Sequence, residues 1–291
     1  MAQRTHSTGS YLARVSVQRA VTAVVTYLLV GGGAVLVLIP FAWMLSTALK
    51  LPDQVYVYPP VWIPEPIVFP QHFVDALQRM LFVNSLRNTL FYAIGSSLGL
   101  TATSSLVAFG FARMRWPGRN AVFLLVIATM MLPGQVTLVP TFVLFSKLNW
   151  VNTFKPLMVP PWFGGAWQVF MLRQFFMTLP LDLDESARID GCSTWGVLWR
   201  IILPLSKPAL ITIALLAFTF YWNEFMGPLV YLNGEEKMVL SIALREMQGQ
   251  YHVAINALMA GTLMTIMPLI ILFYCFQRVF IQGIVFTGIK G

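Results

Sequence analysis

The sequence has little charge for its length. Only 10% of its 291 residues are Asp, Glu, Lys or Arg, and 57% are hydrophobic. Soluble domains have roughly 25% charged residues. A soluble protein with so few charged side chains could not cover its own surface with polar groups. The composition therefore predicts a membrane protein, whose apolar surface faces lipid.

Cysteine and histidine are also scarce, with two and three residues respectively. Cys192 lies in a charged stretch and Cys275 in an apolar run, so neither a disulfide framework nor a metal site is expected. The residues His6, His72 and His252 lie outside the apolar runs, whereas a membrane enzyme would need such groups to converge within them. We therefore expect no catalytic residue, bound cofactor or metal in this chain.

The net charge of +8 does not come from a basic run interleaved with aromatic residues. Nucleic-acid binding is therefore not expected, and the basic residues are better explained as orienting signals in cytoplasmic loops. Residues 1–20 are polar and basic, as at the start of a signal peptide. The apolar run that follows is too long for such a signal and has no A-x-A cleavage site, which predicts a retained membrane anchor.

Uncharged runs between charged residues predict six transmembrane helices, because about 20 apolar helical residues cross a bilayer core. The runs lie within the windows Arg19–Lys50, Arg87–Arg113, Arg119–Lys147, Lys155–Arg173, Lys207–Glu224 with an extension to Leu232, and Glu246–Arg278. If the N-terminus is cytoplasmic, most of the 19 Lys and Arg residues also fall on the cytoplasmic side. Both termini are therefore expected there.

These windows divide the chain into five parts. We expect a cytoplasmic tail (1–20), a first transmembrane helix (21–49), an extracytoplasmic loop (50–83), a core of helices two to six (84–278) that includes a cytoplasmic loop (182–205), and a cytoplasmic tail (279–291). Within the second helix, Gly95 and Gly99 form a Gly-xxx-Gly pattern, which allows another segment to approach closely.

The loop from Asp182 to Leu205 concentrates charge between two apolar stretches. Asp182 and Glu185 fit a capping box at the start of a short helix. Gly191 should end this helix, because glycine readily adopts left-handed backbone angles, and Ser193 can cap a second helix. The loop is therefore predicted to form a bent pair of short helices.

The apolar side of the second short helix is predicted to contain Trp195, Leu198, Trp199, Ile201 and Ile202. These side chains are expected to fix the loop to the transmembrane helices. From the residues alone, two interpretations remain open. The bent pair lies on lipid headgroups as an amphipathic connector, or it docks into a groove on a partner protein.

The stretch "ESARIDGCSTWGVLWRIILPL" resembles the EAA loop of ABC importer permeases, with its E-A-A start, its D-G pair and its closing I-x-L-P at the same spacing. Further stretches resemble the carbohydrate permeases of the MalG type. They are "PFAWMLSTALK", "FARMRWPGR", "MLPGQVTLVP", "YWNEFMGPLVY" and the tail "GIVFTGIKG". The likeness excludes only the first twenty or so residues. The chain departs from the pattern at Ser186, Cys192 and Ile289.

The resemblance implies an all-α membrane protein with the type I ABC importer permease fold. In this family the EAA loop is a coupling helix that sits in a cleft of a cytoplasmic ATPase dimer. The resemblance thus implies that ATPase docking involves Glu185, Ser186, Ala187, Asp190, Gly191, Ile201, Leu203 and Pro204. It also implies a second permease subunit, giving a heterodimer, and an external solute-binding protein that delivers a mono-, di- or oligosaccharide in a prokaryotic cell membrane.

Solute sites in transporters tend to lie at broken helices near mid-membrane. The break "PPWFGG" (160–165) and the aromatic end of the fifth helix suggest a solute path formed by Trp167, Gln168, Tyr221, Trp222, Asn223 and Glu224. Alternatively, these aromatic residues belong to an ordinary interfacial belt. The outer loop Asn233–Tyr251 resembles the segment that reaches toward the solute-binding protein, or is simply solvated.

The chain lacks a phosphate-binding loop of its own. "GIVFTGIK" has two correctly spaced glycines, Gly283 and Gly288, but Ile289 stands where the motif needs lysine. ATP and Mg²⁺ are therefore expected on the separate ATPase subunits. Three other functions remain as alternatives: an importer permease for glycerol phosphate esters or another polar solute, a self-sufficient channel, and a membrane enzyme.

Overall fold

The computed structural model describes residues 6–249 and 254–288, with side chains over 18–249 and 254–277. All regular secondary structure in these ranges is helical, which confirms the predicted all-α class. The first half contains α1 (His6–Ala48), α2 (Gln71–Arg79), α3 (Phe82–Arg113), α4 (Arg119–Ala128) and α5 (Gly134–Lys147), with short helical turns η1 (Pro52–Gln54) and η2 (Thr129–Met131).

The second half is more finely divided. It contains α6 (Lys155–Met158), η3 (Pro160–Phe163), α7 (Ala166–Thr178), α8 (Asp182–Ile189), α9 (Thr194–Val197), the π-helical turn η4 (Leu198–Ile202), α10 (Leu203–Leu205), α11 (Lys207–Asn223), α12 (Met226–Tyr231), η5 (Glu235–Lys237), α13 (Leu240–Glu246) and α14 (Ile255–Gly288). The last residues of the "GIVFTGIKG" motif and of the predicted outer loop Asn233–Tyr251 lie outside the described ranges.

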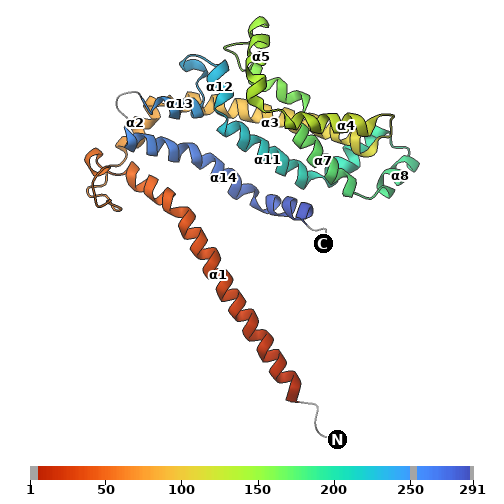
Figure 1. Ribbon diagram of the computed structural model, residues 1–291, viewed down its shortest axis with the longest axis horizontal. Helices are drawn as coiled ribbons and strands as arrows, with labels where there is room; N and C mark the ends of the chain where they lie inside the picture. Colours follow the sequence, from red (N-terminus) through yellow and green to blue (C-terminus); the bar gives the residue numbers. More distant parts are fainter. Residues whose placement is uncertain (1–5, 250–253, 289–291) are drawn as a thin grey trace.

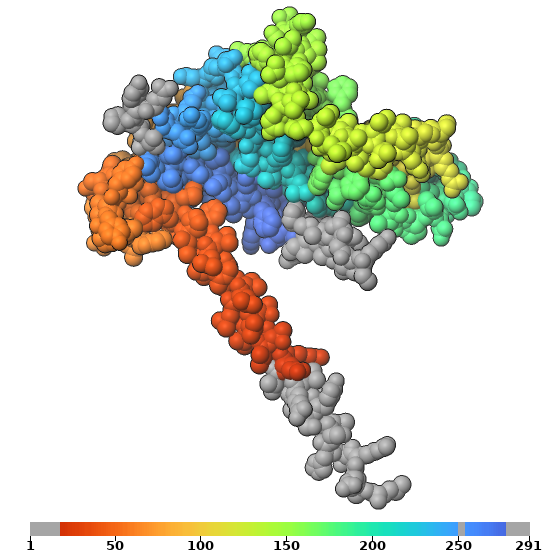
Figure 2. Space-filling view, in the orientation of Figure 1, coloured from red at the N-terminus to blue at the C-terminus, as the bar shows by residue number. Residues whose placement is uncertain are grey.

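Helix α1 projects away from the other helices over most of its length (Figures 1 and 2). Its side chains between Arg19 and Ile39 are exposed, among them many large apolar ones such as Leu28 and Leu29. Only its last turn is buried, next to the start of α14. An apolar helix of this kind requires lipid or another protein around it.

Helix α3 is the central element, and it packs mainly against α7 and α11. Its contact face consists largely of small residues, including buried Ser96 and Gly99. The indole of Trp162 fills the space that a Cβ on Gly99 would need, and its Nε1 donates a hydrogen bond to the carbonyl oxygen of Gly95 at 3.1 Å. The Gly-xxx-Gly pattern thus allows close packing, as expected, but against the turn η3 rather than a long helix.

Two apolar clusters lie at the two ends of α3. At its N-terminal end, α2, α11, α13 and α14 enclose a cluster that includes Met80, Trp222 and Leu240. At its C-terminal end, Phe109 packs with residues of α7, α8, α9 and α11. The second cluster therefore fixes the charged loop to the bundle.

The span count differs from the six predicted windows. Three helices are long and apolar enough to cross a membrane, and two bent pairs bring the number to at most five among the described residues. The fourth window, Lys155–Arg173, is not one helix, because its prolines and the pair Gly164–Gly165 divide it into α6, η3 and α7. The fifth helix ends at Asn223 instead of continuing to Leu232, since Glu224 adopts an extended backbone.

Candidate functional site

The charged loop forms the predicted bent pair of short helices, at the α8 label in Figure 1. Helix α8 spans Asp182–Ile189 and has three acids in its first turn. Their negative charges interact favourably with the positive end of the helix dipole. The predicted capping box is wrong, because Leu181 occupies the N-cap position and no side chain caps the helix. Asp182 is therefore the first helical residue rather than the cap.

The hinge between the two short helices agrees with the sequence prediction. Gly191 has a φ of +83°, in the left-handed region that favours glycine. Its N–H donates to the carbonyl of Arg188 at 3.0 Å, and the N–H of Cys192 donates to Ala187 at 2.8 Å. The Ser193 hydroxyl then accepts a hydrogen bond from the Gly196 N–H at 3.2 Å, which caps the second helix as predicted.

Helix α8 has two distinct faces. Asp184 and Ala187 point into the protein, whereas Glu185 and Ile189, one turn apart on the opposite side, are exposed. The Ile189 side chain is 86% exposed and lies among charged neighbours. One face therefore anchors the helix, and the other presents an acidic surface with an apolar centre.

The second limb is anchored by the aliphatic part of its predicted apolar side, Leu198 and Ile202 with Ile201 half-buried, and in addition by Val197. Val197, Leu198 and Ile202 are buried in the cluster around Phe109. Trp195 and Trp199 are each 63% exposed, so the prediction is wrong for these two side chains, which do not fix the loop to the bundle. The reason is helical periodicity, which places the aliphatic residues inward and turns the two indoles outward.

The eight predicted docking residues divide between surface and interior. Glu185, Ser186, Asp190, Gly191 and Pro204 are exposed, whereas Ile201 and Leu203 are half-buried against the apolar cluster. Ala187 is buried, so its small side chain permits close packing of α8 and does not form part of the outer surface.

Asp184 was not identified from the sequence as a residue of interest. Its Oδ2 lies 3.7 Å from the Nε of Arg113, the last residue of α3, and both side chains are almost fully buried. The pair joins two stretches that the sequence analysis treated separately, "FARMRWPGR" and the charged loop. They lie too far apart in the chain for any local pattern to reveal the contact.

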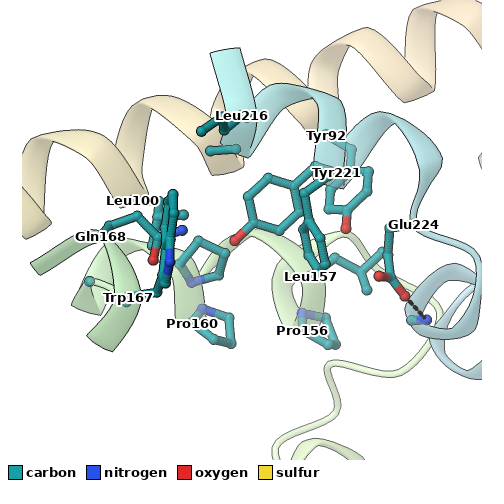
Figure 3. A pocket seen from close by; sticks show the side chains of 16 residues that line it. Tyr92, Leu100, Pro156, Leu157, Pro160, Trp167, Gln168, Leu216, Tyr221 and Glu224 are labelled. Atoms are coloured by element: carbon teal, nitrogen blue, oxygen red, sulfur yellow. Dashed lines mark hydrogen bonds between the residues drawn. The ribbon is translucent and has the colours of Figure 1, made fainter. Parts of the chain in front are cut away.

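A cavity of about 640 Å³ lies between α3, α7, α11 and the broken segment α6–η3. Figure 3 shows Trp167 and Gln168 at one end, Tyr221 in the middle and Glu224 at the other end. The Tyr221 ring makes an edge contact with Tyr92 at 5.5 Å between centroids. Glu224 Oε1 accepts a hydrogen bond from the Gly227 N–H at 2.8 Å, which holds the carboxylate at the start of α12.

Four of the six predicted solute-path residues therefore line one cavity. Trp222 does not, because it is 2% exposed and packs against Phe218 on the opposite side of α11. Asn223 is also absent from the cavity wall, and its amide donates to the Thr219 carbonyl at 2.8 Å. The cavity wall contains Tyr92 and Phe220, which the sequence analysis missed.

The described part of the outer loop is held against α3. The amides of Asn84 and Asn88 donate to the backbone carbonyls of Glu235, Glu236 and Met238. These bonds leave the side chains of Glu235 and Glu236 exposed in the connection between α12 and α13.

Comparisons with known proteins point to one family. Residues 88–285 match the family described as "Binding-protein-dependent transport system inner membrane component". The arabinooligosaccharide permease AraQ of Halalkalibacterium halodurans is 39% identical over 65% of this chain and 67% of its own length. The trehalose/maltose permease MalG of Thermococcus litoralis is 31% identical over 89% and 93%.

Another relative is named for a different solute. The sn-glycerol-3-phosphate permease UgpE of Yersinia pestis is 31% identical over 87% of this chain and 92% of its own length. Among solved structures, a bacterial ABC transporter involved in the import of the acidic polysaccharide alginate has a similar fold. Its TM-score is 0.77 at 23% identity, over 96% of this chain and 99% of that one.

Proposed function

Because the chain belongs to the family of binding-protein-dependent transport system inner membrane components, we propose that it is the permease subunit of an ATP-driven carbohydrate importer. It is a multi-pass membrane protein, and the resemblance to MalG-like permeases is confirmed by its relatives. The solute is a mono-, di- or oligosaccharide, delivered by an external solute-binding protein. Members of this family are transport components, and ATP with Mg²⁺ binds to separate ATPase subunits.

The observation that best supports this proposal is the division of α8 into two faces. A lipid-bound connector would turn its apolar side to the membrane and its charges to water. Here the buried face contains Asp184, and the exposed face combines Ile189 with Glu185 and Asp190. Such a surface suits a protein groove. In this arrangement the ATPase contacts the exposed docking residues, Ala187 supports them, and Ile201 and Leu203 connect them to the bundle.

We propose that the loop and both termini lie in the cytoplasm and that the chain crosses the membrane six times. The segment α6–η3–α7 then forms the fourth crossing as a broken helix, which is tolerated where it is buried in protein or lines a cavity. The exposed apolar surface of α1 supports a second permease subunit as its neighbour. The exposed Glu235 and Glu236 are suitably placed to contact the solute-binding protein.

The cavity supports a carbohydrate rather than a phosphate ester. Trp167 and Tyr221 offer aromatic faces for the C–H faces of a sugar ring, and Gln168 and Glu224 offer hydrogen bonds to hydroxyls. The described cavity wall contains no Lys or Arg. A phosphate group would meet the Glu224 carboxylate without a compensating cation, so glycerol phosphate esters are the less suitable solute.

The experiment that tests this function is purification of the tagged chain from its native membrane in mild detergent. A second permease, an ATPase and an external protein that retains a sugar should copurify. The reconstituted complex should take up that sugar only with ATP. Uptake by the purified chain alone, without an ATPase, would show that it is a self-sufficient channel instead.

Replacing Trp167 with alanine should weaken uptake without reducing the yield of the complex. Loss of one aromatic stacking contact costs about 0.5–1.5 kcal/mol, or roughly a two- to tenfold loss of apparent affinity. The matched control is Trp222→Ala, because Trp222 is buried in the core and its truncation should lower complex yield and uptake together. Equal losses of yield and uptake in both variants would mean that Trp167 only packs.

A further inference from the structure

The guanidinium of Arg113 connects three elements at one point. Arg113 ends α3, its Nη2 donates to the carbonyl of Leu179 at 2.8 Å after α7, and its Nε lies 3.7 Å from Asp184 on α8. The Arg113 and Asp184 side chains are only 2% and 8% exposed. This is the one ion pair that the structure shows among the side chains of residues 18–249 and 254–277.

We propose that Asp184 is a positioning residue whose ion pair with Arg113 transmits movement of α8 to α3. This inference rests on the proposed function. The exposed face of α8 contacts the ATPase, while Asp184 on the buried face contacts the end of α3. The same helix α3 contributes Tyr92 and Leu100 to the cavity wall. A single helix of 32 residues thus connects the ion pair to the solute path.

Burial explains why this pair can transmit movement. A buried charge separated from its partner is strongly unfavourable, so Arg113 and Asp184 must move together. The surrounding contacts in the Phe109 cluster are apolar and non-directional, which allows α8 to slide over its neighbours. The ion pair is therefore the contact that opposes separation of α8 from α3 most strongly.

The distance between the two charged groups can also shorten. At 3.7 Å it is longer than a charge-assisted hydrogen bond, which measures about 2.7–2.9 Å. Arg113 Nε and Asp184 Oδ1 are both buried without a hydrogen-bond partner in this structure. A small shift of α8 toward Arg113 would bring the Asp184 carboxylate within hydrogen-bond distance of the Arg113 Nε. The contact can therefore differ between two states of the transporter, as coupling requires.

The test uses the complete importer in liposomes and measures solute molecules taken up per ATP hydrolysed. Asp184→Asn keeps the shape and removes the charge. The ratio should fall on the order of tenfold, within the usual range of coupling effects, while complex yield and ATP hydrolysis without solute persist. Asp53→Asn makes the same change at an exposed acid in η1, far from α8 along the chain, and this matched control should leave the ratio unchanged.

Asp184→Glu keeps the charge on a longer side chain and should restore the uptake of solute per ATP hydrolysed. If Asp184 only filled space, Asp184→Asn would fit better than Asp184→Glu, and the charge would make no difference. Asp184→Asn leaves the buried charge of Arg113 without a partner. If this variant does not assemble, the double variant Arg113→Gln with Asp184→Asn removes that charge as well. It should assemble and remain uncoupled. Normal uptake per ATP in either assembled variant would overturn the inference. Failure of any ATPase to copurify with the unchanged chain would instead overturn the proposed function.

Discussion

Replacing Gly191 with proline should abolish ATP-driven uptake while the chain still inserts into the membrane. Proline fixes φ near −65°, whereas Gly191 has a φ of +83°. Proline also removes the N–H that donates to Arg188 at 3.0 Å. The two limbs of the loop would then take a different angle, and Glu185 and Ile189 would no longer face the ATPase. Uptake into vesicles and ATPase copurification measure both consequences.

The control for this change is Gly191→Asn. Asparagine tolerates left-handed angles better than other side chains, and no atom lies within 4 Å of the position that its Cβ would occupy. This variant should retain uptake, at a cost of roughly 1 kcal/mol in stability. If the proline variant transports normally, the bend between the limbs is not needed for coupling.

Reversing the charge of Glu185 should release the ATPase from the permease. Glu185 is exposed on the outer face of α8, beside the 86% exposed Ile189. Loss of a charge contact that becomes buried on docking costs about 2–5 kcal/mol, or roughly a 30- to several-thousand-fold loss of affinity. Copurification of the ATPase with a Glu185→Lys chain, at matched membrane expression, measures the effect.

Asp53→Lys provides the matched control, because Asp53 is an exposed acid in the loop between α1 and α2, far from α8 along the chain. The change in net charge is the same, but ATPase association should persist. Undiminished ATPase association in Glu185→Lys would show that the outer face of α8 is not the docking surface.

Local features of the loop could be predicted from the sequence. The left-handed Gly191 and the Ser193 cap depend on a few neighbouring residues, and both are found where they were expected. The capping box failed because Leu181, rather than Asp182, precedes the first helical turn. One residue of displacement at a helix start is enough to change which side chain can cap it.

The orientation of side chains was harder to predict, since composition does not specify a face. The aromatic and polar run at residues 221–224 suggested one set of solute-path residues, but only Tyr221 and Glu224, three positions apart, share the cavity side. Trp222 points into the core. The outward position of Trp195 and Trp199 has the same origin, because they are four residues apart on one helical side.

Long-range contacts could not be predicted at all without the fold. The pairing of Arg113 with Asp184 depends on how α3, α7 and α8 meet, which no single segment specifies. Likewise, the composition of Lys155–Arg173 is apolar enough for a spanning helix. Its prolines and glycines nevertheless divide it, and the resulting break forms one wall of the cavity.

Cross-linking from the position of Ile189 tests the central claim most directly. Cys192 and Cys275 are first replaced with alanine, and Ile189 is then replaced with cysteine in the assembled complex. We predict modification by a membrane-impermeant reagent only from the cytoplasmic side, and a cross-link to the ATPase subunit. A cysteine in place of the buried Ile202 should be neither modified by the reagent nor cross-linked to the ATPase. Modification from the outside, or no cross-link in an active complex, would contradict the account.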